Sequence, residues 1–209
     1  MVSEASIPLR DRLLAEAIGI LSRDGGAALT VRRVAAAAGC STIGVYTHFD
    51  GKAGLIDAVV KDGFEALDGA MAVVDSLEGG VARLWAGTHA YRDWALANPT
   101  HYRVMFDAYV PDLALGPDAA ARGGASFAAH RARVAYAVER GELLRPGGAG
   151  PDGAVTLDDL AHHIWACMHG HVLLQVLRGI SRDDAQVRSE FDRAMGWLLA
   201  GVSMPRTRS

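Results

Sequence analysis

The sequence predicts an all-α protein in which a small N-terminal helix-turn-helix domain precedes a larger helical domain. Apolar residues recur with helical spacing along almost the whole chain, and no run of valine or isoleucine bounded by turn residues indicates a strand. Glycine-containing breaks also divide the first 52 residues into short helices. We therefore expect a first domain over residues 8–68, with its helix-turn-helix at about 31–50, and a second over residues 77–201.

The first predicted helix begins near Pro8, because proline lacks only an amide hydrogen that a first helical turn does not use. Asp24-Gly25-Gly26 is expected to end this helix. Its apolar face comprises Leu9, Leu13, Ala17 and Leu21.

A second, short helix follows Thr30, which is a good N-cap residue, and stops at Gly39. Its apolar stripe consists of Val31, Val34, Ala35 and Ala38. Cys40 occupies the turn, and Ser41 is expected to cap a third helix that runs to about His48.

Asp50-Gly51 breaks the chain again before a longer helix that Lys52 opens. Its apolar residues are Leu55, Ile56, Val59, Val60, Phe64 and Leu67. Further helices are predicted at about 77–97, 99–109, 118–140, 157–178 and 182–201, with an exposed loop at 141–153. Two pairs have the spacing of capping boxes, Thr156 with Asp159 and Ser181 with Asp184.

Composition excludes several classes of protein. Cys40 and Cys167 are the only cysteines and lie far apart, so we expect neither a disulfide framework nor a four-ligand zinc site. Neither a signal peptide nor an apolar run long enough to span a membrane is evident, which favours a cytoplasmic protein. The net charge of −3 does not by itself indicate a nucleic-acid partner.

Two short helices joined by a glycine turn meet the geometric requirement of a helix-turn-helix, whose second helix enters the major groove of DNA. Val45 and Phe49 are spaced to pack inward, and Cys40 is assigned to the same core. The outward residues, Thr42, Ile43, Tyr46, Thr47 and His48, suit contact with bases and phosphates. The alternative is a solvated helix face in an ordinary bundle.

The run from Thr30 to Ala35, then Gly39-Cys40-Ser41, Gly44 to Phe49, and Lys52 resemble the DNA-binding domain of TetR-type transcriptional regulators. The second half is similar to a C-terminal type of that family named for Trp, His and Gly, here Trp165, His169 and Gly170. The resemblance spans nearly the whole chain. It implies a homodimer that binds a palindromic operator, with a small molecule releasing the protein from DNA.

The resemblance also implies a role for each residue of the motif. Thr30, Tyr46, His48 and Lys52 would hold phosphates, whereas Arg32, Thr42, Ile43, Gly44 and Thr47 would face the groove. The third helix has no Arg, Asn or Gln for a two-pronged contact with a purine. Specificity is therefore expected to rest on Arg32, on apolar contact with thymine and on DNA shape.

The larger domain is rich in aromatic residues and methionine, which suits a mostly apolar inducer. The candidates for its lining are Trp85, Tyr102, Phe106, Trp165 and His169, although most aromatic residues here are expected to be core. The nearby charges Arg92, Asp93, Arg103 and Asp107 can offset one another. A fixed, highly charged ligand is therefore not expected.

Four histidines lie close together at 162, 163, 169 and 171, which raises the alternative of a helical metal-dependent enzyme. Only Asp158 with His162 has the spacing of a helical metal-ligand pair, so no catalytic residue, metal or cofactor is assigned. His169 is interpreted as a hydrogen-bonded core or interface residue. A helical adaptor without DNA binding is a further alternative, but neither alternative explains residues 30–52.

The last two helices are expected to form the dimer contact, as a four-helix interface between two subunits. The apolar residues assigned to it are Leu173, Val176, Leu177, Phe191, Met195, Leu198 and Leu199. The alternative is that these residues pack only within one subunit. Activation in place of repression also stays open, because binding residues do not determine the consequence at a promoter.

Overall fold

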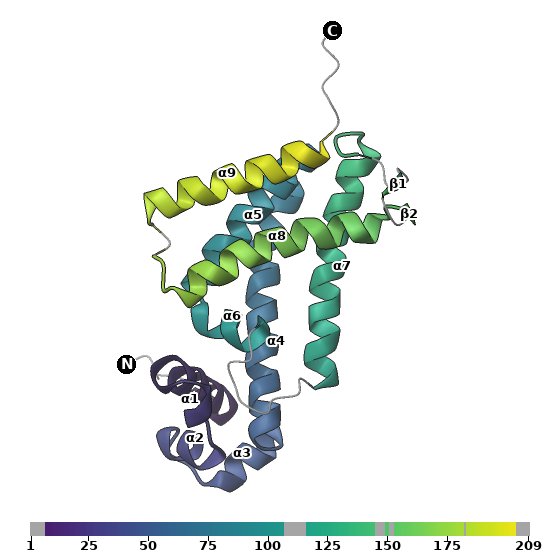
Figure 1. The fold of residues 1–209 in the computed structure, drawn as a ribbon. Helices are drawn as coiled ribbons and strands as arrows, with labels where there is room; N and C mark the ends of the chain where they lie inside the picture. Colours follow the sequence, from purple (N-terminus) through teal and green to yellow (C-terminus); the bar gives the residue numbers. More distant parts are fainter. Residues whose placement is uncertain (1–6, 107–115, 145–148, 151–152, 182, 204–209) are drawn as a thin grey trace, which may run out of the picture. The chain divides into compact units, whose positions relative to one another are not determined.

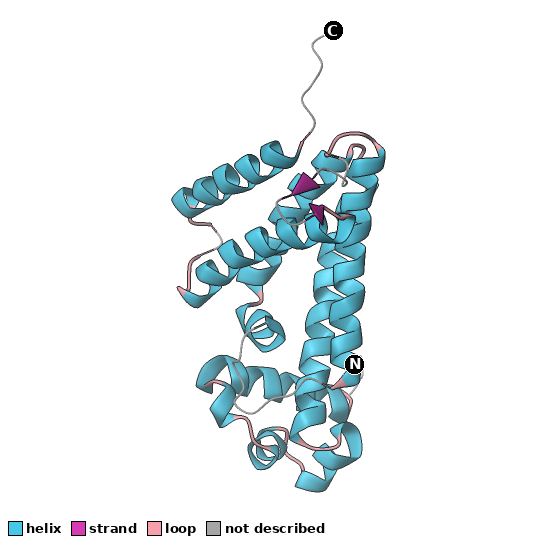
Figure 2. Ribbon diagram, turned by 45° about the vertical axis from the view of Figure 1, so that its right-hand side comes forward, coloured by secondary structure: helices cyan, strands magenta, loops and turns pink. Residues whose placement is uncertain are grey.

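The computed structural model describes residues 7–106, 116–144, 149–150, 153–181 and 183–203. Helices make up nearly all of this part (Figure 2). The described residues also contain one antiparallel pair of two-residue strands, β1 (Ala149–Gly150) and β2 (Gly153–Ala154). The all-α prediction is confirmed. No helix in the described part of the chain has the length and apolarity needed to cross a membrane.

The chain divides into two compact units, and the first comprises residues 1–65 and 99–123. It contains α1 (Leu9–Asp24), η1 (Gly26–Ala28), α2 (Val31–Ala37), α3 (Thr42–Phe49), the start of α4 (Lys52–Ala72), α6 (Pro99–Phe106) and the start of α7 (Pro117–Glu139) (Figure 1). Helices α1, α2 and α3 pack on one another. Their shared core includes Leu13, Ala17, Leu21, Val34, Ala35, Val45 and Phe49.

The predicted helix boundaries in this unit follow from caps and glycines. The Thr30 side chain accepts a hydrogen bond from the Arg33 amide at the start of α2, and Gly39 takes a positive φ of 65° after its end. Asp50 and Gly51 both have positive φ between α3 and α4. Ser41 is the N-cap residue of α3 as predicted, but its side chain makes no capping hydrogen bond.

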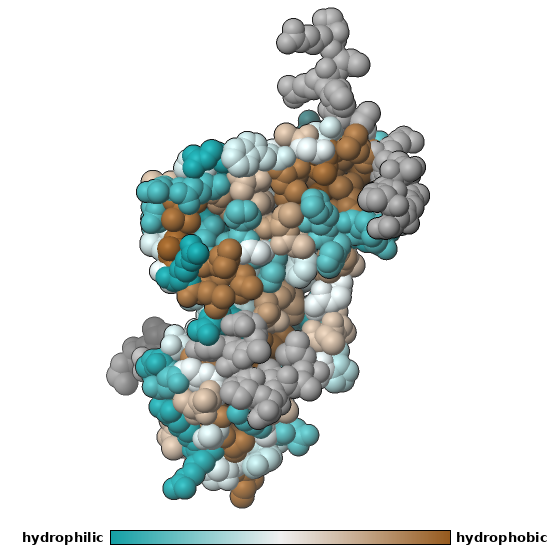
Figure 3. All heavy atoms as spheres, in the orientation of Figure 1, coloured by the Kyte–Doolittle hydropathy of each residue, from teal (hydrophilic) through white to brown (hydrophobic). Residues whose placement is uncertain are grey.

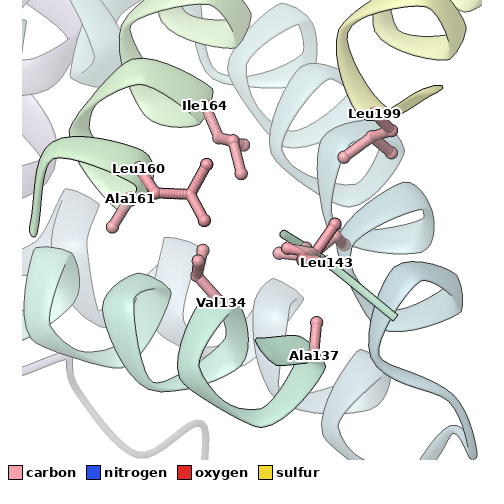
Figure 4. Packing of buried hydrophobic residues seen from close by; sticks show 8 residues of the cluster. Val134, Ala137, Leu143, Leu160, Ala161, Ile164 and Leu199 are labelled. Carbon is pink, nitrogen blue, oxygen red and sulfur yellow. The ribbon is translucent and has the colours of Figure 1, made fainter. Parts of the chain in front are cut away.

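The second unit comprises residues 66–98 and 124–209. It contains η2 (Val73–Ser76), α5 (Gly80–Ala97), α8 (Leu157–Leu177), α9 (Ala185–Val202) and the later part of α7. Helices α5, α8 and α9 pack pairwise. Figure 4 shows how apolar residues from α7, α8, α9 and the segment after α7 meet in its core: Val134, Ala137, Leu143, Leu160, Ala161, Ile164 and Leu199.

Glu142 fixes the start of α5 from outside the helix. Its carboxylate accepts a hydrogen bond from the Val81 amide at 2.9 Å and another from Arg140 Nε at 2.6 Å. These bonds, that from Val81 foremost, hold the pKa of Glu142 below its ordinary value. Gly80 lies directly on Ala137, so that a β carbon there would collide with the backbone of α7.

The two predicted capping boxes differ in the structure. The Thr156–Asp159 capping box is present at the start of α8, as predicted. The Ser181–Asp184 box is wrong, because Asp184 is itself the N-cap of α9 and accepts from the Val187 amide at 3.0 Å. Parts of the expected helix at 99–109, the expected loop at 141–153 and Asp107 lie outside the described residues.

Candidate nucleic-acid interface

Two buried residues anchor α3 to the first unit. Val45 is fully buried and Phe49 nearly so, as their spacing predicted. A β carbon at Gly44 would lie 3.2 Å from Cys40 Sγ and 3.5 Å from Leu9 Cδ2. Gly44 therefore faces the packing of α3 within its own unit. Cys40 is only partly buried, so its assignment to the core was too strong.

Side-chain hydrogen bonds hold α2 against α1. The Arg12 guanidinium donates to the Ala38 carbonyl at 2.9 Å, and Arg33 donates to the Asp24 carboxylate at 2.7 Å. Arg32, in contrast, is exposed and has no hydrogen bond or ion pair with any residue in the described ranges. Of the two adjacent arginines, Arg32 is thus the one available for an external partner.

The outward face of α3 carries the side chains that the sequence predicted there. Ile43 is 73% exposed and Tyr46 is 59% exposed, although both are large and largely apolar. Thr42, Thr47 and His48 are also exposed. Large apolar groups in water are unfavourable unless a partner covers them, so this face is suited to contact with another molecule.

The two threonine hydroxyls in this region have opposite hydrogen-bonding capacities. Thr30 Oγ1 accepts from the Arg33 amide at 3.2 Å, which leaves its own hydrogen free for an acceptor such as a phosphate oxygen. Thr47 Oγ1 lies 2.9 Å from the Ile43 carbonyl and donates its hydrogen to it. Thr47 therefore presents to the outside a methyl group and an oxygen that can only accept.

Tyr46 and Lys52 lie on either side of the break between α3 and α4. A β carbon at Gly51 would lie 3.1 Å from Tyr46 Cε1, so the ring packs directly against this glycine. Lys52, half-buried, is the first residue of α4, where the positive end of the helix dipole adds to its charge. Residue 54 has to be glycine, because a β carbon at this position would collide with the Phe49 carbonyl oxygen.

In the second unit, His169 stacks on Trp165 with ring centroids 4.7 Å apart, and its Nδ1 lies 2.9 Å from the Tyr91 hydroxyl. Burial lowers the pKa of His169, which keeps the ring neutral near pH 7. His169 is thus a hydrogen-bonded, half-buried residue, as interpreted from sequence. Phe127 packs edge-on against Trp165 at 6.1 Å.

The five candidate ligand residues divide between the units. Tyr102 and Phe106 belong to the first unit, where Phe106 also contacts Phe64 at 5.8 Å between ring centroids. Trp85, Trp165 and His169 belong to the second, where Trp85 contacts the His89 ring at 5.0 Å. A surface hollow of about 320 Å³ in the first unit is lined by other residues: Lys61, Asp118, Ala121 and Arg122.

Two arginines of the second unit, Arg92 and Arg188, contact the Asp93 carboxylate. Arg92 is fully buried, and its Nε donates to the Gln175 side chain at 2.8 Å while its Nη1 lies 3.3 Å from Asp93. Arg188 of α9 donates to the same Asp93 carboxylate at 2.8 Å. The offsetting of Arg92 by Asp93 therefore agrees with the expectation from sequence. Among the described residues, no three His, Cys, Asp or Glu side chains lie close enough to hold a metal ion.

The apolar residues assigned to a dimer contact have to be revised. Phe191, Met195, Leu199 and Val176 are buried within the subunit, which is the alternative that periodicity left open. Of the other assigned residues, Leu177 is 51% exposed, as a dimer contact requires, and Leu173 and Leu198 are half-buried. The remaining large apolar residues that these two helices expose are Leu174 (54%), which follows Leu173, and Trp197 (74%). The exposed set is thus Leu174, Leu177 and Trp197. We call these three residues the α8–α9 face. Figure 3 shows hydrophobic surface over the end of α8 and beside α9.

Two protein-family models match different parts of the chain. Residues 13–59 match the family model described as bacterial regulatory proteins, tetR family. Residues 84–198 match the model described as tetracyclin repressor-like, C-terminal domain. Neither description names the Trp-His-Gly type, which stays a prediction. No curated protein sequence matches the chain.

Solved structures resemble the chain along nearly its whole length. A protein of unknown function from Rhodococcus sp. RHA1 is 26% identical, with a TM-score of 0.77 over 98% of this chain and all of its own. A tetR-family regulatory protein from Rhodococcus RHA1 is 18% identical, with a TM-score of 0.69 over 96% of this chain and all of its own. The ketosteroid transcriptional regulator KstR2 of Mycobacterium tuberculosis is 18% identical, with a TM-score of 0.64 over 98% and 100%. At 18% identity, the last two share the fold.

Proposed function

Since this chain belongs to the TetR family of bacterial regulatory proteins, we propose that it binds a palindromic operator as a homodimer and represses transcription until a small molecule releases it. Residues 8–68 are proposed as the DNA-binding domain and residues 77–201 as the ligand-binding and dimerisation domain. The protein would act in the cytoplasm, where its operator is. The observation that carries the proposal is the exposed outward face of α3, which offers hydroxyl, imidazole and apolar groups together.

On the DNA, we assign phosphate contacts to Thr30, Tyr46, His48 and Lys52. The unused hydroxyl hydrogen of Thr30 and the position of Lys52 at the start of α4 support this assignment. Base contacts are assigned to Arg32, Thr42, Ile43, Gly44 and Thr47. For Gly44 the contribution is limited to the close packing of α3, because its missing side chain would point toward Cys40 and Leu9.

The homodimer is proposed to form through the α8–α9 face. Exposed leucines and a tryptophan on two neighbouring helices can pack against the same residues of a second copy, which makes a two-fold interface of four helices. To bind a palindrome, such a dimer must place its two copies of α3 in successive major grooves, about 34 Å apart.

The inducer is proposed to be mostly apolar, aromatic or lipid-like. Its proposed contacts in the second unit are Trp85, Trp165 and His169, and Tyr102 and Phe106 are separate candidates in the first unit. The neutral state of His169 supports low charge in the ligand, because its ring offers no charge to pair with a charged group. To release DNA, the inducer must bind more tightly to a conformation whose recognition helices no longer match the operator.

The test is selection of bound sequences from random duplex DNA, followed by titration of the selected duplex. The variant Tyr46→Phe removes only a hydroxyl and should weaken binding about tenfold on selected and random DNA alike, because a hydrogen bond to a charged phosphate is lost. Tyr136→Phe in the second unit is the matched control. Selection that yields no common palindrome would contradict the proposal.

Release is tested on the same duplex. Uncharged aromatic and lipid-like compounds, sugars and polyanions are screened for loss of the protein–DNA complex, and hits are repeated with Phe106→Ala and Trp165→Ala. We expect apolar hits that one or both variants weaken. A sugar or polyanion as the sole releasing compound, or hits indifferent to both variants, would show that the ligand class is misassigned.

A further inference from the structure

The centre of the outward face of α3 is apolar. Successive residues of an α-helix are turned by about 100°, so the direction opposite the buried pair Val45 and Phe49 falls on Thr47, with Ile43 beside it one turn earlier. Tyr46 and His48 lie about 100° to either side of this centre, whereas Thr42 lies close to Phe49 on the helix wheel and Gly44 faces Cys40 and Leu9. The part of α3 that would reach furthest into a groove is therefore the pair Ile43 and Thr47.

This pair has no hydrogen-bond donor to offer. Ile43 is a hydrocarbon that is 73% exposed, and the Thr47 hydroxyl hydrogen is already donated to the Ile43 carbonyl at 2.9 Å. Guanine presents only acceptors, N7 and O6, in the major groove, so this pair cannot bond to its edge. The apolar group that the major groove does present is the C5 methyl of thymine.

We propose that Ile43 and the methyl group of Thr47 form a methyl-binding patch that selects thymine, through its C5 methyl, at the centre of each operator half-site. The inference rests on the proposed operator binding and adds the chemical group that is recognised. Ile43 contributes most of the apolar area, and the hydrogen bond of Thr47 fixes its rotamer, so that its methyl group and oxygen keep fixed positions.

The first experiment changes only the methyl group. In the duplex obtained by selection, each thymine of a half-site is replaced in turn by uracil, which removes the C5 methyl and keeps the base-pairing edge. At one or two adjacent positions the wild-type protein should bind about fourfold more weakly for each methyl removed, the amount expected from burial of one such group. In a second pair of duplexes, the same thymine is replaced by cytosine or by 5-methylcytosine. The duplex with 5-methylcytosine, which carries the methyl group, should be bound about fourfold more tightly than the duplex with cytosine.

The protein variants assign the effect to the patch. Ile43→Ala should bind thymine and uracil duplexes nearly equally, and its exposed position means that far-ultraviolet circular dichroism should be unchanged. Thr47→Val keeps the shape and a methyl group but has no hydroxyl, so it should retain both affinity and the preference for thymine. Ser41→Ala is the control, because Ser41 is exposed, its side chain makes no capping hydrogen bond and it has no assigned DNA contact; it should leave the thymine-to-uracil ratio unchanged.

Two results would overturn the inference. Uracil duplexes bound as tightly as thymine duplexes at every position would show that no methyl is recognised. Loss of affinity in Thr47→Val without any uracil effect would show that the threonine oxygen accepts a hydrogen bond from a cytosine or adenine amino group. Either result would leave the selected palindrome intact, whereas failure of the proposed function would leave no palindrome to modify.

Discussion

Trp197→Ala should convert the proposed homodimer into a weakly associating one. The Trp197 side chain is 74% exposed in the single subunit, whereas its neighbour Leu199 is buried. A tryptophan can bury about 250 Å², so about 185 Å² of it stays available for a partner. At ~25 cal/mol per Å², complete coverage of that area would contribute about 4.5 kcal/mol per subunit.

A realistic interface covers about half of that area, or roughly 2 kcal/mol per subunit. In a two-fold dimer both copies of Trp197 lie in the interface, so the free energy of association should be weaker by about 4 kcal/mol. This raises the dissociation constant about a thousandfold. The assay is sedimentation equilibrium over a concentration series, with circular dichroism to verify the fold. Operator binding should weaken in parallel.

Val73→Ala is the matched control, because Val73 is another apolar residue that is 68% exposed but lies outside the α8–α9 face. It should leave the dimer dissociation constant unchanged. A wild-type protein that is monomeric at micromolar concentration would refute the reasoning. So would a shift of less than about threefold in Trp197→Ala, since burial of even one quarter of the available area predicts more.

Three further predictions concern single side chains. Lys52→Ala should weaken binding to all duplexes alike and reduce the slope of log affinity against log salt by about one, as measured by fluorescence anisotropy, whereas Lys61→Ala should not. Arg32→Ala should relax the preference at one position per half-site by about 1–3 kcal/mol in a repeated selection, and an unchanged profile would exclude base contact. Glu142→Ala should cost about 1 kcal/mol at pH 7 in urea unfolding, the value of a lost helix cap, whereas Glu139→Ala should not. Because the pKa of Glu142 is lower in the folded than in the unfolded chain, its stabilisation is complete above about pH 4.3 and is lost as the pH falls through the folded pKa; a cost independent of pH would contradict this account.

Local signals were sufficient to predict helices α1, α2 and α3 of the first unit, whereas no local signal indicated that residues 99–123 belong to the same unit. Thr30 and Gly39 act through bonds and backbone angles that involve their immediate neighbours, so their effect on α2 can be inferred from a short stretch of sequence. The same holds for Val45 and Phe49, whose spacing alone determines that they share a buried edge. Ser41 makes no capping hydrogen bond, because a serine at the N-cap favours such a bond but does not fix the side-chain rotamer that the bond requires.

Such local signals do not predict which residues far apart in the sequence come into contact. An apolar stripe can pack within its own subunit or against another, which is why Phe191 and Met195 were assigned to a dimer contact that their burial contradicts. Trp197, the most exposed large apolar residue in the described part of the chain, was not singled out from sequence. The hydrogen bond between Tyr91 and His169 joins residues 78 positions apart, and no local pattern predicts its partner.

The packing of Tyr46 on Gly51 has a consequence for the entropy of DNA binding. Freezing a mobile side chain at an interface costs about 0.5–1.5 kcal/mol, and this loss is subtracted from the affinity. The Tyr46 ring is already held against a glycine that no larger residue can replace without strain, because its φ is 91° and the ring lies 3.1 Å from the position of a β carbon. Part of the ordering of Tyr46 is therefore completed when the chain folds, and in the proposed dimer this applies to both copies of the ring.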